Sequence, residues 1–127
     1  ARTLERARRL VARASQRWPQ TSFAAIEAGA QTPTSAELYV NATPLGQSGQ
    51  PYHSLIPKRV AVGAAAFDLV YRPAQTPFLL EARDRGLRTI GGFTMLLEQA
   101  LATFEAWFSF RPPLDEGARN RLEALAA

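Results

Sequence analysis

Apolar and polar residues alternate along the chain with the period of amphipathic helices in four places. Over residues 3–17 apolar residues recur every three or four positions, which predicts a helix with Thr3 as its N-cap. Similar patterns predict helices over residues 76–85 and 93–108, the second being the most strongly patterned of the chain. A last amphipathic helix is expected over residues 115–126, with its leucines facing inward.

Short uninterrupted apolar runs between these helices predict strands. They lie at residues 36–44, at about residues 66–71 and at residues 87–90, while residues 21–28 are a weaker strand or strand–helix candidate. Buried strands that alternate with helices are typical of a parallel sheet with helices on both faces. The pattern therefore predicts the α/β class.

Composition narrows the class of protein. The 127 residues suffice for one domain or part of one, and the longest apolar runs are too short to span a bilayer. The chain has no cysteine, which excludes a disulfide framework and thiolate chemistry. The cytoplasm is the expected compartment, and no membrane partner is expected.

Positive charge is concentrated at the N-terminus of a chain whose net charge is +4. The arginines concerned are Arg2, Arg6, Arg8, Arg9, Arg13 and Arg17. Such a cluster could meet a phosphate, an anionic membrane or nucleic acid, or could be a solvated helix face. Nucleic acid is disfavoured, because no exposed aromatic residues are interleaved with the arginines and the rest of the chain is not basic.

Each predicted strand ends in a polar or glycine-rich turn: Asn41 and Thr43, then Tyr71 and Arg72, then Gly91 and Gly92. Because the carboxyl ends of parallel strands share one edge of a sheet, a ligand crevice is expected there. Each group also has a plainer interpretation. Asn41 and Thr43 could close a turn, Tyr71 could belong to the core, and the glycines could relieve crowding before a helix.

Other chemistry is sparse. Gln99 lies among apolar residues of the strongest predicted helix, where it either finds hydrogen-bond partners or sits at the edge of the apolar stripe. His53 is the only histidine and has no acidic neighbour, and no set of residues has metal-ligand spacing. Nucleophile elbow, P-loop and G-x-G-x-x-G motifs are missing. The residues alone indicate an α/β ligand-binding domain with no metal.

Four segments carry a resemblance to a known family. They are "RTLERA" (2–7), "VNATPLG" (40–46), "FDLVYRPAQTPFLLEARDRG" (67–86) and "GGFTMLLEQALATFEAW" (91–107). In order and spacing they resemble the C-terminal half of shikimate dehydrogenase. The resemblance implies a Rossmann-like cofactor domain beside a substrate domain, and the reversible NADPH-dependent reduction of 3-dehydroshikimate to shikimate in aromatic amino-acid biosynthesis.

The resemblance also implies roles for single residues. Tyr71 is similar to the tyrosine that reaches the substrate, and Gln99 to the glutamine that hydrogen-bonds a substrate hydroxyl. Leu69 would border the nicotinamide, the carbonyl of Gly92 would meet its carboxamide, and Met95 would pack near the same ring. These implied roles place the substrate and the nicotinamide at the strand ends.

Arg2, Thr3 and Arg6 fall on the family's loop for the 2′-phosphate of NADP. Arginine suits such a dianion, whereas an NAD site would favour an acid, and Glu5 is the only one nearby. We therefore expect NADP as the cofactor. The full predicted cofactor-binding set is Arg2, Thr3, Arg6, Asn41, Thr43, Leu69, Gly92 and Met95.

Departures from the family pattern limit what the chain is expected to do. Ala1 stands where the family has an asparagine, the glycine-rich phosphate turn and the substrate domain are absent, and Lys58 is the only lysine. The family's catalytic lysine–aspartate pair is thus missing. We expect residues 1–127 to be the C-terminal portion of a Rossmann-like cofactor domain, inactive alone.

The missing strands would leave the strand that ends at Val40 at an edge of the sheet. Three outcomes are expected for this edge: pairing with a second copy, pairing with an absent segment, or local disorder in residues 1–35. For the function, the alternatives are a quinate/shikimate dehydrogenase, a shikimate dehydrogenase-like paralogue, and a non-catalytic interaction module.

Overall fold

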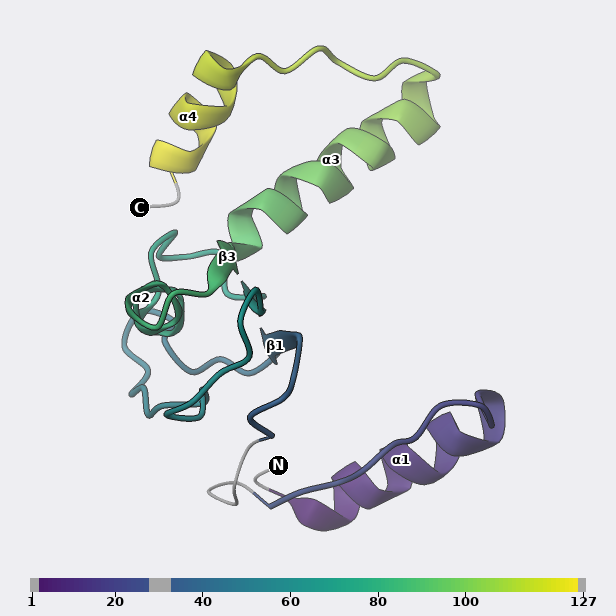
Figure 1. Cartoon of the computed structure of the whole chain (residues 1–127). Coiled ribbons are helices and arrows are strands. Elements are labelled where there is room, and N and C mark those ends of the chain that lie inside the picture. Colours follow the sequence, from purple (N-terminus) through teal and green to yellow (C-terminus); the bar gives the residue numbers. More distant parts are fainter. Residues whose placement is uncertain (1–2, 28–32, 126–127) are drawn as a thin grey trace. The chain divides into compact units, whose positions relative to one another are not determined.

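The computed structural model describes residues 3–27 and 33–125, which fall into two compact units, residues 1–32 and 33–127 (Figure 1). Each unit is described by itself. Two predictions fall partly outside the described residues: the role of Arg2, and the last residue of the strand or strand–helix candidate at residues 21–28. Over the described ranges, no helix combines the length and hydropathy that a membrane crossing requires.

The first unit is built around helix α1 (Leu4–Arg17), as the spacing predicts. Thr3 occupies the N-cap position, although its side chain makes no capping hydrogen bond. Glu5 and Arg9 form an ion pair one helical turn apart. The prediction of a strand or helix at residues 21–28 is wrong for residues 21–27, which form neither.

The second unit contains a parallel sheet of three strands, β1 (Leu38–Asn41), β2 (Ala65–Asp68) and β3 (Arg88–Ile90), in the order β1-β2-β3. The α/β class and the parallel sheet are thus confirmed. β1 lies at an edge of the sheet, as expected of the strand that contains Val40. Its last residue, Asn41, is in register with Asp68 at the end of β2.

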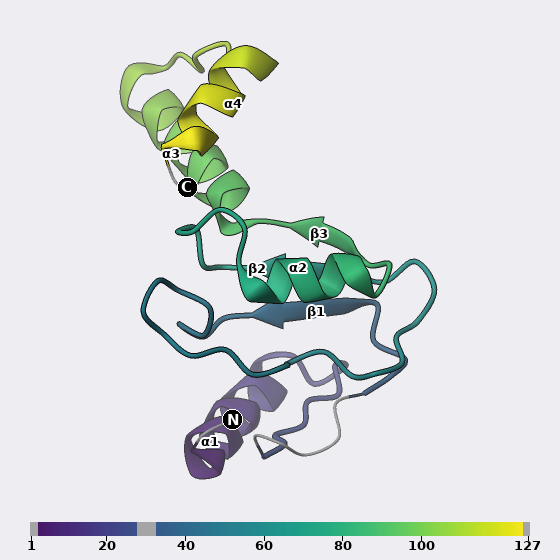
Figure 2. The same cartoon turned by 90° about the vertical axis from the view of Figure 1, so that its left-hand side faces the viewer.

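Helix α2 (Pro77–Asp84) lies along one face of this sheet and packs against β2 and β3 (Figure 2). Local sequence explains its bounds. The Thr76 side chain accepts a hydrogen bond from the N–H of Leu79, Pro77 takes the first helical position, and Gly86 follows the helix with φ 76°. Its buried residues Phe78, Leu79 and Ala82 join Tyr39, Ile56, Ala64, Ala66 and Leu87 in one apolar core.

The opposite face of the sheet is more exposed than predicted. Side chains on neighbouring strand positions point to opposite faces, so Tyr39 is buried beneath α2, whereas Leu38 and Val40 are 51% and 50% exposed. Ile90 of β3, which lies on the same face of the sheet as Val40, is 43% exposed. Within residues 33–125, α2 is the helix with extensive contacts to the strands. Within this unit, helix α2 thus covers one face of the sheet and leaves Leu38, Val40 and Ile90 on the other face half-exposed.

β2 is shorter than predicted. It ends at Asp68 rather than at Tyr71, because its partner β1 ends at Asn41 and the last cross-strand backbone bond runs from the N–H of Leu69 to the carbonyl of Asn41. Tyr71 thus lies in the connection that follows the strand, before the cis Arg72–Pro73 peptide bond.

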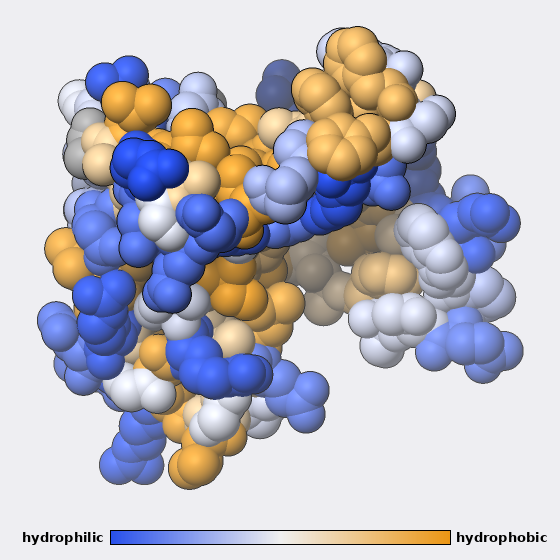
Figure 3. Space-filling model, turned by 90° about the horizontal axis from the view of Figure 1, so that it is seen from above, coloured by the Kyte–Doolittle hydropathy of each residue, from blue (hydrophilic) through white to orange (hydrophobic). Residues whose placement is uncertain are grey.

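Helices α3 (Gly92–Phe108) and α4 (Glu116–Ala124) complete the second unit, close to the predicted ranges. Glu98 of α3 forms ion pairs with Arg111 and with Arg119 of α4. The inward placement predicted for the α4 leucines is wrong, because Leu122 and Leu125 are 38% and 76% exposed. Apolar side chains are correspondingly visible among charged ones on the face that carries α3 and α4 (Figure 3).

Candidate functional site

The first two strands both end in a turn that is closed by their own last side chain. Oδ1 of Asn41 accepts hydrogen bonds from the N–H and the hydroxyl of Thr43, at 3.1 and 2.6 Å. Oδ1 of Asp68 accepts from the N–H of Val70 at 2.9 Å. A side chain that bonds the backbone two residues ahead is the signature of an Asx turn. The turn-closing interpretation of Asn41 is therefore confirmed.

These two turns are joined to each other. Nδ2 of Asn41 donates to Oδ1 of Asp68 at 3.0 Å, and also to the carbonyl of Leu45 at 3.0 Å. The hydroxyl of Thr76 donates to Oδ2 of Asp68 while it caps α2. We call Asn41, Thr43, Asp68 and Thr76 the strand-end network. It ties the carboxyl ends of two strands to the start of a helix.

Burial separates the members of the strand-end network into two kinds. Asn41, Asp68 and Thr76 are fully buried, whereas Thr43 is exposed. Among the described residues, no buried side-chain nitrogen or oxygen lacks a hydrogen-bond partner. The side chains of the buried members thus form their hydrogen bonds within the protein, and Thr43 is the member of the network that lies at the surface.

The end of β2 also meets the start of α3, at Gly92. A Cβ atom at Gly92 would lie 2.5 Å from the carbonyl oxygen of Val70 and 2.7 Å from that of Leu69. No side chain fits at such distances, so only glycine permits this approach. Of the predicted site residues, the structure thus brings together Asn41, Thr43, Leu69 and Gly92 at the carboxyl end of the sheet.

Tyr71 and Gln99, the two predicted substrate-binding residues, both lie at the surface. Tyr71 is 49% exposed, and Gln99 lines a shallow apolar groove on α3 together with Leu96, Phe104 and Trp107. Neither side chain forms a hydrogen bond within the described residues. Their polar groups are thus free of the core, and Met95, one turn before Gln99, is half-buried. The core interpretation of Tyr71 is wrong.

In the first unit, Thr3 and Arg6 are exposed. Glu5, the only acid near them, is paired with Arg9 rather than with Arg6. The Arg6 guanidinium forms no ion pair within the described ranges and has the donor chemistry that an anionic phosphate needs. The predicted role of Arg2 falls outside the described residues.

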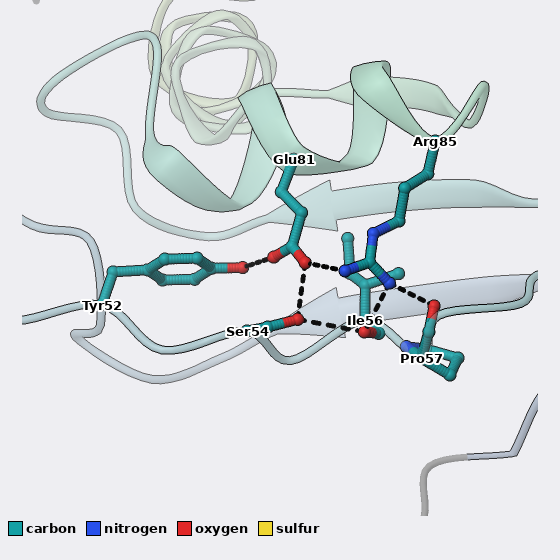
Figure 4. Close-up of polar contacts among 6 residues, drawn as sticks. All are labelled: Tyr52, Ser54, Ile56, Pro57, Glu81 and Arg85. Atoms are coloured by element: carbon teal, nitrogen blue, oxygen red, sulfur yellow. Dashed lines mark hydrogen bonds and ion pairs between the residues drawn. The ribbon is translucent and has the colours of Figure 1, made fainter.

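A second polar cluster fastens the loop between β1 and β2 to α2, and sequence reasoning missed it. The Glu81 carboxylate accepts hydrogen bonds from Tyr52, Ser54 and Arg85, as Figure 4 shows. Arg85 also donates to the carbonyls of Ile56 and Pro57. We call Tyr52, Ser54, Glu81 and Arg85 the loop clamp. Only the Glu81–Arg85 spacing of four was visible in the sequence.

Electrostatics differ between the groups of this unit. Burial, followed by the Glu81 hydrogen bond and charge, raises the pKa of Tyr52 well above its ordinary value. On α3, the hydrogen bond from Arg119 and the charges of Arg111 and Arg119 lower the pKa of Glu98. Within the described residues, no three side chains of His, Cys, Asp and Glu gather in a way that could hold a metal ion.

A parallel α/β sheet whose strand ends carry polar turns and a glycine contact is the arrangement of Rossmann-like nucleotide-binding domains. The particular relatives are shikimate dehydrogenases. The chain is 40% identical over 119 residues, which are 94% of its length, to shikimate dehydrogenase (NADP(+)) of Sinorhizobium medicae strain WSM419. The chain is thus homologous to a part of shikimate dehydrogenase, and the resemblance read from its motifs is confirmed.

One solved shikimate dehydrogenase structure gives the same result, and a second solved structure shares the fold. Shikimate 5-dehydrogenase of Thermus thermophilus, in complex with NADP(H) and shikimate, is 36% identical with a TM-score of 0.54 over 72% of this chain and 34% of that one. The ligand-free 5-ketofructose reductase of Gluconobacter sp. strain CHM43 shares the fold, with a TM-score of 0.80 at 24% identity over 98% of this chain and 45% of that one. No protein-family model matches the chain. The chain spans 41% of the length of its Sinorhizobium medicae relative.

Proposed function

We propose that this chain is part of an NADP-dependent shikimate dehydrogenase, namely the C-terminal portion of its cofactor domain. The observation that carries the proposal is the 40% identity to such an enzyme over 94% of the chain. The site geometry supports it, because the predicted residues Leu69 and Gly92 meet at the carboxyl end of the sheet. The reaction would be the reversible reduction of 3-dehydroshikimate to shikimate, in the cytoplasm.

The residues present fit the ligands that this function requires. The exposed guanidinium of Arg6, with Arg2 and Thr3 before it, would hold the 2′-phosphate of NADP. The exposed phenol of Tyr71 and amide of Gln99 would hydrogen-bond hydroxyl groups of shikimate. NADPH would supply the hydride when bound.

Asn41 takes a different role in this proposal from the one expected of it. Its side chain is fully buried and all its hydrogen-bonding positions are used within the protein. Direct contact with the cofactor therefore falls to Thr43, an exposed residue in the turn beside it.

Calorimetric titration of the full chain with NADPH and with NADH tests the proposed cofactor. We expect tighter binding of NADPH, and loss of that preference in Arg2→Ala/Arg6→Ala. The matched control is Arg8→Ala/Arg13→Ala, which removes the same charge from α1 but should keep the preference. Equal binding of the two nucleotides, or an equal loss in both variants, would contradict the NADP site. Negligible binding of both would leave a non-catalytic module.

The edge strand β1 makes a second part of this proposal. Its outer backbone groups would pair with a second copy or with a segment of the same protein that this chain lacks. Light scattering on the full chain tests the first of these, because pairing between copies predicts a dimer whose fraction rises with concentration. A strict monomer at all concentrations would leave pairing within one protein.

A further inference from the structure

The buried side chains of the strand-end network point to a role that lies behind the ligand-contacting residues. We propose that Asn41 and Asp68 act as one positioning pair, which sets the Thr43 segment and the Val70–Tyr71 segment relative to each other. The coupling between the two segments follows from the geometry of the chain alone. Its consequence for ligand binding rests on the function proposed above.

The hydrogen bonds of Asn41 leave its amide one orientation. Its two N–H groups are used by Leu45 and Asp68, and its oxygen accepts both bonds from Thr43. An exchange of oxygen and nitrogen would set donors against the N–H of Thr43 and acceptors against Asp68. The amide is therefore a rigid connector between the two turns.

Asp68 performs the matching task on β2. One carboxylate oxygen accepts from both Asn41 and the N–H of Val70, and the other accepts from Thr76. Asn41 and Asp68 face each other in register, although 27 positions separate them in the chain. Displacement of either turn must break a bond that the other turn uses, and fully satisfied buried networks of this kind specify one arrangement.

The pair acts through its neighbours, since both side chains are fully buried and cannot touch a ligand. Thr43 and Tyr71, which follow these two side chains, are exposed. Asn41 and Asp68 are thus positioning residues, and Thr43 and Tyr71 are the groups they present.

Amide NMR of the full chain tests the coupling without any ligand. In Asp68→Ala we expect the Thr43 amide signal, on the other strand end, to shift and its hydrogen exchange to accelerate about tenfold or more. Asn41→Ala should do the same at Val70, and the double variant should add little to either single one. Asp68→Asn keeps the oxygen that Asn41 and Val70 need and should restore the Thr43 signal.

Leu87→Ala is the control for lost stability, because it removes a buried side chain from the same apolar core without touching the network. Its Thr43 and Val70 signals should stay in place. A Thr43 signal that does not respond to Asp68→Ala would overturn the coupling. So would a response of equal size in Leu87→Ala, since the effect would then be one of general stability.

Titration with NADP+ then tests the consequence for binding. We expect Asp68→Ala to raise the Kd about tenfold and Asp68→Asn and Leu87→Ala to leave it nearly unchanged. If the unaltered chain does not bind NADP+, the function proposed above fails while the NMR result still decides the pair. If Asp68→Ala shifts Thr43 but binds NADP+ as the unaltered chain does, the role of the pair in ligand positioning is refuted.

Discussion

The strand-end network and the loop clamp solve the same problem by different means. Each joins segments that lie 27 to 29 positions apart in the chain through a carboxylate that accepts several hydrogen bonds. Asp68 is fully buried and its partners are neutral, whereas Glu81 and Arg85 form an ion pair whose side chains are 18% and 25% exposed. We infer that the strand-end network fixes the orientation of the two strand-end turns, whereas the loop clamp mainly holds a loop against α2. The reason is that water can replace lost hydrogen-bond partners only in the partly exposed loop clamp.

The largest effect is expected at Gly92, beside the end of β2. Gly92→Ala would place a Cβ at 2.5 Å from one backbone carbonyl oxygen and 2.7 Å from another. Because backbone cannot move aside cheaply, we expect a loss of about 3 kcal/mol in the free energy of unfolding. Urea unfolding of the full chain measures it. Gly91→Ala is the control, since its nearest contact would be an ordinary 3.6 Å to Leu79, and equal losses would contradict the steric argument.

Next in size is Asn41→Leu, which removes the centre of the strand-end network but keeps a side chain with the same branching. Asp68 and the N–H of Thr43 would lose buried partners, for an expected loss of about 2 kcal/mol. Tyr39→Phe, on the same strand, removes one bond to the exposed residue Pro33 and should cost much less. The same unfolding experiment compares the two, and a larger loss in Tyr39→Phe would refute the ranking.

Glu81→Gln should have a smaller effect, of about 1 kcal/mol, because the clamp is partly in water. Salt distinguishes the two regions. Raising the ionic strength should reduce the loss of unfolding free energy that Glu81→Gln causes. The loss caused by Asn41→Leu should stay the same, because Glu81 has a charged partner, Arg85, whereas the partners in the strand-end network of Asp68 are neutral. Denaturant midpoints at low and high salt measure both losses, and equal salt dependence of the two variants would contradict the difference between the two clusters.

The loop clamp also predicts a dependence on alkaline pH. Burial and Glu81 raise the pKa of Tyr52 above its ordinary value of 10.0. The folded state therefore keeps the phenolic proton up to a higher pH than the unfolded chain does. The stability from this proton is full below pH 10.0 and is lost as pH rises through that value toward the folded pKa. Unfolding between neutral and strongly alkaline pH should show this decline, and Tyr52→Phe should flatten it. A decline unchanged in Tyr52→Phe would assign it to other groups.

The smallest effect is expected at Glu98, whose side chain is more exposed than the carboxylates of Asp68 and Glu81. Arg119 and Arg111 lower its pKa, so its contribution is present above the ordinary carboxyl pKa and is lost as pH falls through the lowered one. Glu98→Gln should speed hydrogen exchange in α4 at neutral pH and remove the acid dependence of that exchange. Glu105→Gln, which removes the longer 3.4 Å contact with Arg111, is the control and should have less effect.

Elements with local signals were predictable from the sequence. Thr76 and Pro77 mark the start of α2 and Gly86 its end, because caps and turn glycines act within a few residues. The long apolar repeat similarly placed the start of α3 to within one residue. The candidate strand-end residues were named from residue type and motif, whereas the close approach of Gly92 to the carbonyl of Leu69 was not predicted.

What failed depends on contacts between distant segments. The end of β2 is set by the length of β1, so Tyr71 lies beyond the strand. Whether Leu38 and Val40 are buried depends on which face α2 covers, and apolar pattern does not reveal that. Asp68 could be seen in its motif with Tyr71 and Thr76, but its pairing with Asn41 could not.

The sequence by itself determined the helices, the parallel α/β class and the kinship with shikimate dehydrogenase, because these depend on local caps, periodicity and motif spacing. The tertiary structure alone decided that Asn41 is an internal connector rather than an exposed group. The physical reason is that strand register set it opposite Asp68, where burial required each of its donors and acceptors to find a partner within the protein.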